Sequence, residues 1–488
     1  MSIINRNSEL DNLIKTGGSL VNQGRLEEAE AVYKHALEIE PDNVDALFGH
    51  ARSLSRQGKF VAAERSYRRA WELAPEDPLS WSRMGGVMNN LERYAEAEDF
   101  HKHAAEIAPD NWLIWSGLGQ SLGMQAKFAE AAEALKNATK LGPESFQLEG
   151  ALGRALLRSN QFEEAERAYR RACKLNPSSA AAWRDLGTCL QELKRGMEAR
   201  EAFDIALKLD PNDANAWFHF GLLLDSMKET VEAETAFRRA CELEPQDVRH
   251  WVALNGSQRT LRRFVEAEES IRKAISLGEQ SGILWRWLGT TLLEGNKSVE
   301  AEEALSTAIE LAPEDDEAWS QLGLSLARQE KFAEAESAIT RAIEIAPDRG
   351  RYHFLLGLSL VLQDRIQDAI TSMETSCSLA PNNAWFKHYL GVVLFIDDRL
   401  SEAEECLRRA LELGIPNPLT WHLLGQILQK QKRIDEADMV YEDGLRIFPD
   451  SKELREGRQK VFSIKEALWL LSQIPGGREA LDEWEKST

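Results

Sequence analysis

The sequence predicts an all-α fold in which one helical hairpin is repeated along the chain as an α-solenoid. The main observation is a period of 34 residues: alanine recurs at thirteen positions with this spacing, from Ala29 to Ala437. Such a period is typical of solenoids, in which each unit buries its apolar face against the next. The frame has no insertion or deletion. We therefore expect an N-terminal extension over residues 1–9, thirteen repeats over 10–451, and a capping helix with a short tail over 452–488.

The repeat from Ala180 to Asp213 shows why each unit is expected to be a hairpin. Its apolar residues recur at helical spacing in two stretches, Trp183, Leu186, Leu190 and Leu193, and then Ala199, Phe203, Ala206 and Leu207. A turn at Lys194–Gly196 separates the stretches. Pro211 follows the second, and a proline just past a helix cannot continue it. The pattern predicts two antiparallel helices of about 12–15 residues in each repeat.

Small residues recur at fixed positions when each repeat is numbered from 1, starting at Leu10. Position 8 is glycine in eleven repeats, position 27 is alanine in eleven and position 32 is proline in eleven, while tryptophan fills position 4 in eight. A glycine inside a helix costs about 1 kcal/mol relative to alanine, so its recurrence needs a packing reason. We expect positions 8 and 20 to let the two helices of a hairpin approach closely, with bulky residues at positions 4, 7 and 24 around them.

This pattern resembles the tetratricopeptide repeat, a unit with large apolar residues at positions 4 and 7, small residues at positions 8, 20 and 27, and proline at position 32. One repeat meets every requirement, through Trp183, Leu186, Gly187, Ala199, Ala206 and Pro211. The resemblance implies a right-handed superhelix whose first helices line a concave groove and whose second helices face outward. It also implies a protein-interaction scaffold, although this fold alone does not specify a partner.

The expected groove is basic on an otherwise acidic chain. The net charge is −21, which disfavours general binding to nucleic acids or anionic membranes. By the resemblance, positions 2, 5, 6, 9, 12 and 13 line the groove, and thirteen basic residues there face seven acidic ones. These arginines either bind an acidic partner or pair with neighbouring groove acids. The candidate partner-binding residues are Arg52, Arg56, Arg83, Arg154, Arg158, Arg184, Arg249 and Arg286.

Repeats 11 and 12 are expected to differ, because their groove positions hold large apolar residues. Phe354, Leu358, Trp385, Tyr389 and Phe395 should converge on one wall of the groove. An exposed apolar patch of this kind usually marks an interface, here with a partner protein or with a second copy of the chain as a homodimer. The alternative is that the C-terminal helix, expected over Lys452–Gln473, or the tail after it folds back over these side chains.

Chemical motifs point away from catalysis. The chain has no phosphate-binding loop, dinucleotide-binding glycine run, HExxH motif or nucleophile elbow, so we expect no enzyme, no cofactor and no metal site. Its five cysteines form no close pair and are typical of buried thiols in the cytoplasm. The start MSIINRNSEL has no apolar stretch, and no run of the chain is long enough to span a membrane.

Family-specific sites are absent as well. Position 5 is never lysine and position 6 is never asparagine, which excludes the carboxylate clamp of chaperone-tail-binding members and the asparagine ladder of the sugar-transferase branch. The sequence therefore predicts a non-catalytic scaffold that binds a peptide or protein segment in its groove. The alternatives are a homo-oligomeric assembly element and a regulatory subunit of a separately encoded enzyme.

Overall fold

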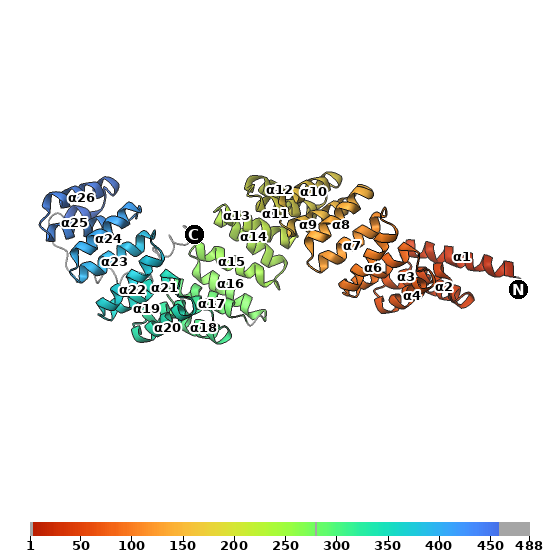
Figure 1. Cartoon of the computed structure of the whole chain (residues 1–488), viewed down its shortest axis with the longest axis horizontal. Coiled ribbons are helices and arrows are strands. Elements are labelled where there is room, and N and C mark those ends of the chain that lie inside the picture. The colour runs from red at the N-terminus through yellow and green to blue at the C-terminus, as the bar shows by residue number, and fades with distance from the viewer. Residues whose placement is uncertain (1–2, 279–280, 458–488) are drawn as a thin grey trace. The chain divides into compact units, whose positions relative to one another are not determined.

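The computed structural model describes residues 3–278 and 281–457, and every regular element in these ranges is a helix. The chain divides into two compact units, the first ending at Leu243 and the second starting at Glu244 (Figure 1). Helices α1–α14 belong to the first unit and α15–α27 to the second. The predicted all-α repeat fold is confirmed.

Each repeat contributes a first and a second helix. The first helices are α1 (Ile3–Asn22), α3 (Val44–Arg56), α5 (Pro78–Asn90), α7 (Trp112–Met124), α9 (Phe146–Arg158), α11 (Ala180–Glu192), α13 (Ala214–Ser226), α15 (Val248–Thr260), α17 (Gly282–Glu294), α19 (Asp316–Arg328), α21 (Gly350–Leu362), α23 (Ala384–Ile396) and α25 (Pro418–Lys430). The second helices are α2 (Leu26–Ile39), α4 (Phe60–Leu73), α6 (Tyr94–Ile107), α8 (Phe128–Leu141), α10 (Phe162–Leu175), α12 (Gly196–Leu209), α14 (Thr230–Leu243), α16 (Phe264–Ser276), α18 (Ser298–Leu311), α20 (Phe332–Ile345), α22 (Ile366–Leu379), α24 (Leu400–Glu412) and α26 (Ile434–Ile447).

The two ends of the repeat array extend these helices. α1 begins at Ile3, so it runs through the expected boundary at residue 10 and the extension is continuous with the first helix of repeat 1. At the other end α27 (Lys452–Gly457) begins at the first residue of the expected capping helix and packs on α25 and α26. The rest of that expected helix, and the tail after it, lie outside the described residues.

The core of each hairpin is built around the periodic alanine at position 20. All thirteen of these alanines, Ala29 to Ala437, are completely buried. Position 8 lies against the second helix, as expected: a Cβ added to Gly153 would lie 2.7 Å from the Tyr169 ring, and one added to Gly221 would lie 2.6 Å from the Phe237 ring. The glycine therefore makes room for the large side chain at position 24 of the same repeat.

Repeat 8 replaces this arrangement with a polar one. Asn255 stands where the glycine is expected, and it is 1% exposed. Its Nδ2 donates to the Ala267 carbonyl at 2.9 Å and to Thr291 Oγ1 at 3.1 Å. Asn255 thus joins α15 to α16 and to the first helix of the next repeat. A buried amide with such partners keeps the hairpin closed without the glycine.

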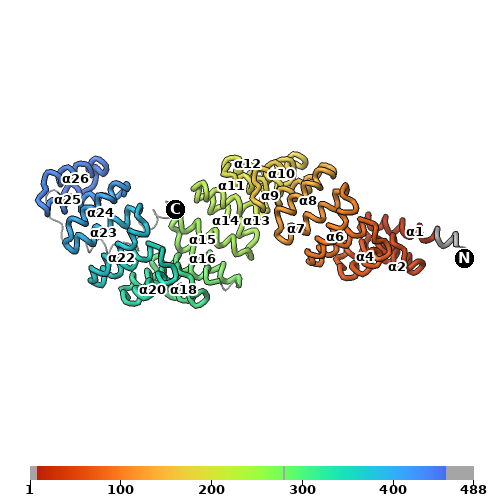
Figure 2. The backbone as a smooth tube through the Cα atoms, viewed as in Figure 1, coloured from red at the N-terminus to blue at the C-terminus, as the bar shows by residue number. Residues whose placement is uncertain are grey.

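The turns between the two helices of a repeat follow one rule (Figure 2). In all thirteen repeats the residue at position 15 has a positive φ, and only Gly24 and Gly58 among them are glycines. The backbone closes the first helix with reverse hydrogen bonds, as when Lys59 N donates to the Leu54 carbonyl at 2.9 Å. Eleven side-chain-bearing residues accept this left-handed conformation, which costs about 1 kcal/mol for residues other than asparagine and aspartate.

The tryptophan at position 4 and the proline at position 32 are linked. In six repeats the indole Nε1 donates to the carbonyl of the proline six residues earlier, as from Trp183 to Pro177 at 3.0 Å and from Trp217 to Pro211 at 2.9 Å. His353 makes the same contact with Pro347 at 3.1 Å. In these seven repeats the bond ties the start of the first helix to the loop before it.

Candidate functional site

A pocket of about 780 Å³ lies among the first helices of repeats 4–7, all within the first unit. The first helices α7, α9, α11 and α13 contribute most of its lining, and α8 and α10 complete it; these helices run from orange to green in Figure 1. We call it the arginine pocket, because Arg154, Arg158 and Arg184 all line it. Three of the eight predicted basic residues are therefore brought to one place.

The wall of the arginine pocket is apolar in one part and polar in another. Small and apolar residues line the first part: Gly119, Ala131, Leu135, Ala151 and Ala155. Amide, hydroxyl and imidazole side chains join the arginines in the second: Gln120, Thr188, Asn215 and His219. A wall of this composition suits a chain segment that has both an apolar side chain and polar or acidic groups.

The three arginines differ in how they are held. Arg184 donates to Asp185 at 2.9 Å and to Asp213 at 2.8 Å, and its side chain is 26% exposed. Arg154 is 62% exposed and reaches Asp185 only at 3.5 Å. The Arg158 guanidinium lies over the Phe128 ring, 4.9 Å from its centroid. Arg184 is thus a structural ion pair, while Arg154 and Arg158 keep donors for a ligand.

Tyr169 is a residue of this pocket that the sequence patterns assign only to the core. It lines the pocket, its side chain is completely buried, and its hydroxyl has no hydrogen-bond partner among the described residues. Burial, and then the nearby Asp185 carboxylate, raises the pKa of the hydroxyl, which stays protonated. The signal for it was a tyrosine at position 24, where the flanking repeats have Leu135 and Phe203.

The other predicted arginines of the first unit lie outside the pocket. Arg56 Nη1 donates to the Val21 carbonyl at 2.7 Å and so satisfies the end of α1. The Arg83 guanidinium lies 4.4 Å from the centroid of the Phe48 ring. Arg52 is exposed on α3. The guanidinium groups of Arg56 and Arg83 thus have contacts within the protein. A partner-binding role for all three arginines stays a prediction.

The two predicted arginines of the second unit pair with aspartates that cap helices. Arg249 Nη2 lies 2.6 Å from Asp247 Oδ2, and Arg286 Nε lies 2.9 Å from Asp315 Oδ2. Asp247 also accepts from the first turn of α15 and Asp315 from that of α19. Both arginines thus pair with acids, but these are helix-capping aspartates at position 34 and not the groove acids of the expected alternative.

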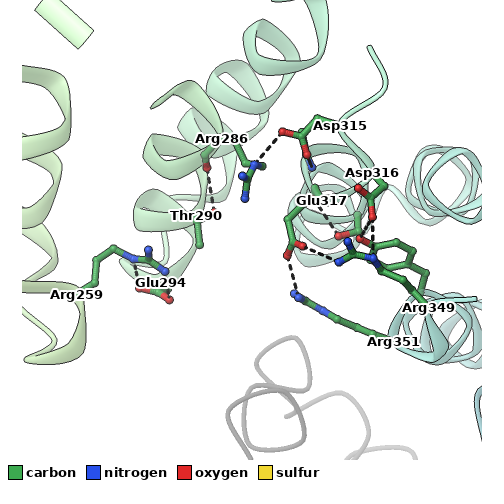
Figure 3. A network of polar contacts seen from close by, with 12 residues as sticks. Arg259, Arg286, Thr290, Glu294, Asp315, Asp316, Glu317, Arg349 and Arg351 are labelled. Carbon is green, nitrogen blue, oxygen red and sulfur yellow. Dashed lines mark hydrogen bonds and ion pairs between the residues drawn. The ribbon is translucent and has the colours of Figure 1, made fainter. Parts of the chain in front are cut away.

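Further ion pairs extend this arrangement over repeats 8–11, as Figure 3 shows. Arg259 donates twice to Glu294, both times at 2.9 Å. Arg351 lies 2.9 Å from Glu317, and its side chain is only 12% exposed. We call these contacts, with that between Arg286 and Asp315, the ion-pair network. Its guanidinium groups are engaged within the protein.

The apolar segment of repeats 11 and 12 converges as expected, but it is buried. Phe354 and Tyr389 have ring centroids 5.3 Å apart, and Trp385 stacks on Tyr389 at 6.1 Å. Phe354, Trp385, Tyr389 and Phe395 are at most 8% exposed, and Leu358 is partly buried against the same cluster. The exposed patch expected here is not found: these side chains are buried or partly buried, and they belong to one cluster with the core of repeats 11–13. The alternative cover, by the C-terminal tail, concerns residues outside the described ranges.

One group of side chains could hold a metal ion by distance alone. Glu244, Asp247 and His250 offer ligand atoms within 4.8 Å of one another. Asp247, however, already accepts from the backbone N–H and the guanidinium of Arg249. A guanidinium at the same carboxylate opposes a cation, so the group is better explained as the capped and paired start of α15.

Comparison with protein families bears on the repeats themselves. Family models described as tetratricopeptide repeat match residues 20–85, then 150–196, 190–248, 257–316 and 320–384, and finally 419–451. The chain belongs to the tetratricopeptide repeat family. Membership supports a protein–protein interaction scaffold, since repeats of this family generally serve as non-catalytic binding modules. No curated protein matches the chain significantly.

Solved structures similar to this tetratricopeptide repeat protein include several of the same family. The Cut9–Hcn1 hetero-tetramer of the APC/C matches at 14% identity, over 86% of this chain and 96% of that chain, with a TM-score of 0.44. Yeast Tom70 matches at 18% identity, over 77% and 93%, with a TM-score of 0.36. YrrB, described as a TPR protein with an unusual peptide-binding site, matches at 25% identity, over 37% and 94%, with a TM-score of 0.32. Within the described residues no helix has the length and apolar character needed to cross a membrane.

Proposed function

We propose that this tetratricopeptide repeat protein is a non-catalytic scaffold that binds an acidic, extended segment of a partner protein in the arginine pocket. The observation that carries the proposal is the state of Arg154, which lines the pocket with a 62% exposed side chain and only a 3.5 Å contact to Asp185. An arginine with spare donors beside a cavity is well suited to bind a carboxylate. The cytoplasmic location expected from the cysteines stays a prediction.

The shape and composition of the pocket support a chain segment as ligand. Gln120 and Asn215 line it from different first helices, and each offers an amide that can donate to and accept from a peptide backbone. The apolar residues beside them, such as Ala151 and Leu135, can accept a side chain of the ligand. The whole chain has a net charge of −21, which makes this local excess of arginine a selective feature.

The proposal can be tested with the full chain and a fluorescein-labelled nonapeptide, Gly-Ser-Glu-Glu-Leu-Glu-Glu-Ser-Gly, by fluorescence anisotropy. The double variant Arg154→Glu with Arg158→Glu should bind this acidic probe about 10-fold more weakly or worse, because two favourable charges become repulsive. Arg184 is left unchanged, since a glutamate there would face Asp185 and Asp213 and disturb the fold. Raising NaCl to 0.5 M should shrink the difference.

A matched control is Arg65→Glu with Arg167→Glu, which changes the net charge equally at exposed positions of the second helices α4 and α10. This control should bind the acidic probe as the wild type does. Equal affinity of the wild type for the probe and for its counterpart with four lysines would contradict the proposal. So would equal losses in the pocket variant and the control.

A further inference from the structure

The Tyr169 hydroxyl is a polar group at a position that is apolar in the neighbouring repeats 4, 6 and 7, where Leu135, Phe203 and Phe237 stand. Position 24 is Phe203 in repeat 6 and Phe237 in repeat 7, where rings without a hydroxyl fill the same place. The ring of Tyr169 needs the space above Gly153, where an added Cβ would lie 2.7 Å away. Packing thus accounts for the ring of this pocket-lining residue but not for its hydroxyl, which is buried and has no hydrogen-bond partner in the described residues.

A buried hydroxyl without a partner has lost its hydration, so a ligand atom that accepts from it would restore a hydrogen bond. The raised pKa of Tyr169 keeps it a donor. Arg154 lines the same pocket as Tyr169, and its side chain is 62% exposed. The pocket therefore offers two donor side chains, one of them charged, and an anion can accept from both.

The charge balance indicates which anion fits. Arg184 is held between Asp185 and Asp213, so the three arginines of the pocket and these two carboxylates leave a single net positive charge. A carboxylate carries one negative charge at neutral pH, whereas a phosphoryl group carries about −1.5 to −2. The Asp185 carboxylate, whose side chain is 14% exposed, would also repel a dianion more strongly than a monoanion. The site favours a monoanion.

Another part of the pocket wall is apolar and is formed by residues with small side chains or none. Ala151 and Ala155 of α9 and Gly123 of α7 line it, and a Cβ at Gly123 would meet no atom within 4 Å. Phe128 also lines the pocket, and the Arg158 guanidinium lies over its ring. Such a surface can accept an aliphatic side chain of the ligand.

We propose, on the basis of the proposed function, that the arginine pocket is a subsite for an acidic side chain adjacent to an aliphatic one, with the Tyr169 hydroxyl and Arg154 donating to the same carboxylate. The aliphatic side chain packs against Ala151, Ala155 and Gly123. This assigns Tyr169, a side chain of the repeat core, to ligand recognition.

The test is a double-mutant cycle between the protein and the probe. The protein change is Tyr169→Phe, which keeps the ring that repeats 6 and 7 use at this position. The probe change replaces the two glutamates that flank leucine by glutamine. Tyr169→Phe should weaken binding of the glutamate probe about 10-fold and leave the affinity for the glutamine probe unchanged. The reason is that a hydrogen bond to a charged group is lost only with the glutamate probe. Replacing leucine by alanine should also weaken binding about 10-fold.

Tyr67→Phe is the matched control, since Tyr67 is buried at position 24 of repeat 2 and does not line the pocket. It should bind both probes as the wild type does. If Tyr169→Phe weakens both probes equally, or neither, the subsite is overturned while the acidic-segment function stands. If the wild type does not distinguish glutamate from glutamine probes at all, the proposed function itself fails, and the subsite fails with it.

Discussion

The arginine pocket of repeats 4–7 and the ion-pair network of repeats 8–11 use the same residue type on corresponding first helices, with opposite results. In the network, Arg259 and Arg351 each lie 2.9 Å from a glutamate. In the pocket, Arg158 contacts an aromatic ring and Arg154 is 62% exposed. The network arginines stabilise the fold, as Arg184 of the pocket does, whereas Arg154 and Arg158 keep donors for a ligand.

The position of the arginine within its repeat contributes to this difference. Arg184 and Arg286 occupy position 5 and pair with the helix-capping aspartate 29 residues later, Asp213 or Asp315. Arg154 and Arg158 occupy positions 9 and 13, and position 5 of their repeat is Gly150. An arginine at position 5 is therefore engaged where its own repeat ends in a capping aspartate. Counting basic residues along the groove does not distinguish the two cases.

The largest expected effect is on the network. Glu317→Ala should destabilise repeats 10 and 11 by about 2 kcal/mol, because it leaves the 12% exposed Arg351 without its closest carboxylate. Faster hydrogen exchange in α19 and α21 would report it. The exposed Glu334→Ala on α20 is the control, and Arg158→Ala in the pocket should change stability by less than about 0.5 kcal/mol. Equal effects of Glu317→Ala and Arg158→Ala would remove the distinction between the regions.

A second comparison tests whether the glycine at position 8 packs against the side chain at position 24 in both regions. A Cβ at Gly153 would lie 2.7 Å from the Tyr169 ring, and one at Gly323 would lie 2.4 Å from Ile339. Changing either glycine to alanine should cost about 1–3 kcal/mol by overpacking. Gly123→Ala, with no neighbour within 4 Å, should be neutral or slightly stabilising. Urea unfolding gives the free energy of unfolding of all three variants. A Gly153→Ala variant as stable as the wild type would contradict the assigned core.

Removing the charge of Asp185, which lines the pocket, should increase the affinity for the acidic nonapeptide. Asp185→Asn takes away the carboxylate that faces Arg154 at 3.5 Å, so the acidic nonapeptide should bind about 3-fold to 5-fold more tightly. Asp315→Asn, in the network, should leave that affinity unchanged. Weaker binding by Asp185→Asn would mean that this carboxylate positions the ligand instead of competing with it.

The smallest effect concerns the turns. Ala126, at the turn between α7 and α8, has a φ of 60°, and Asn296 has one of 61° between α17 and α18. Ala126→Gly should stabilise the protein by about 0.5 kcal/mol, since alanine is strained in this conformation and glycine is not. Asn296→Gly should change little, because asparagine tolerates it. Thermal unfolding followed by circular dichroism can compare them, and a destabilised Ala126→Gly would argue against strain at position 15.

The sequence by itself determined the repeat frame, the hairpins and the family. These follow from local chemistry: helical spacing of apolar residues, as in the repeat that contains Trp183 and Phe203, and a proline such as Pro211 that ends each hairpin. The structure confirmed the hairpins, with every alanine of position 20 buried. Part of the site was predictable too, since Arg154, Arg158 and Arg184 were candidates and line one pocket.

Only the tertiary structure decided which candidates are available. It engaged Arg249 and Arg286 with capping aspartates, buried Trp385 and Phe395 in a core cluster, and placed Tyr169 in the lining of the pocket. The physical reason is that burial and ion pairing depend on side chains that a neighbouring repeat supplies, often about 30 residues away in the chain. A local pattern specifies the helix on which a side chain lies, but the atoms that meet it come from the next helix pair.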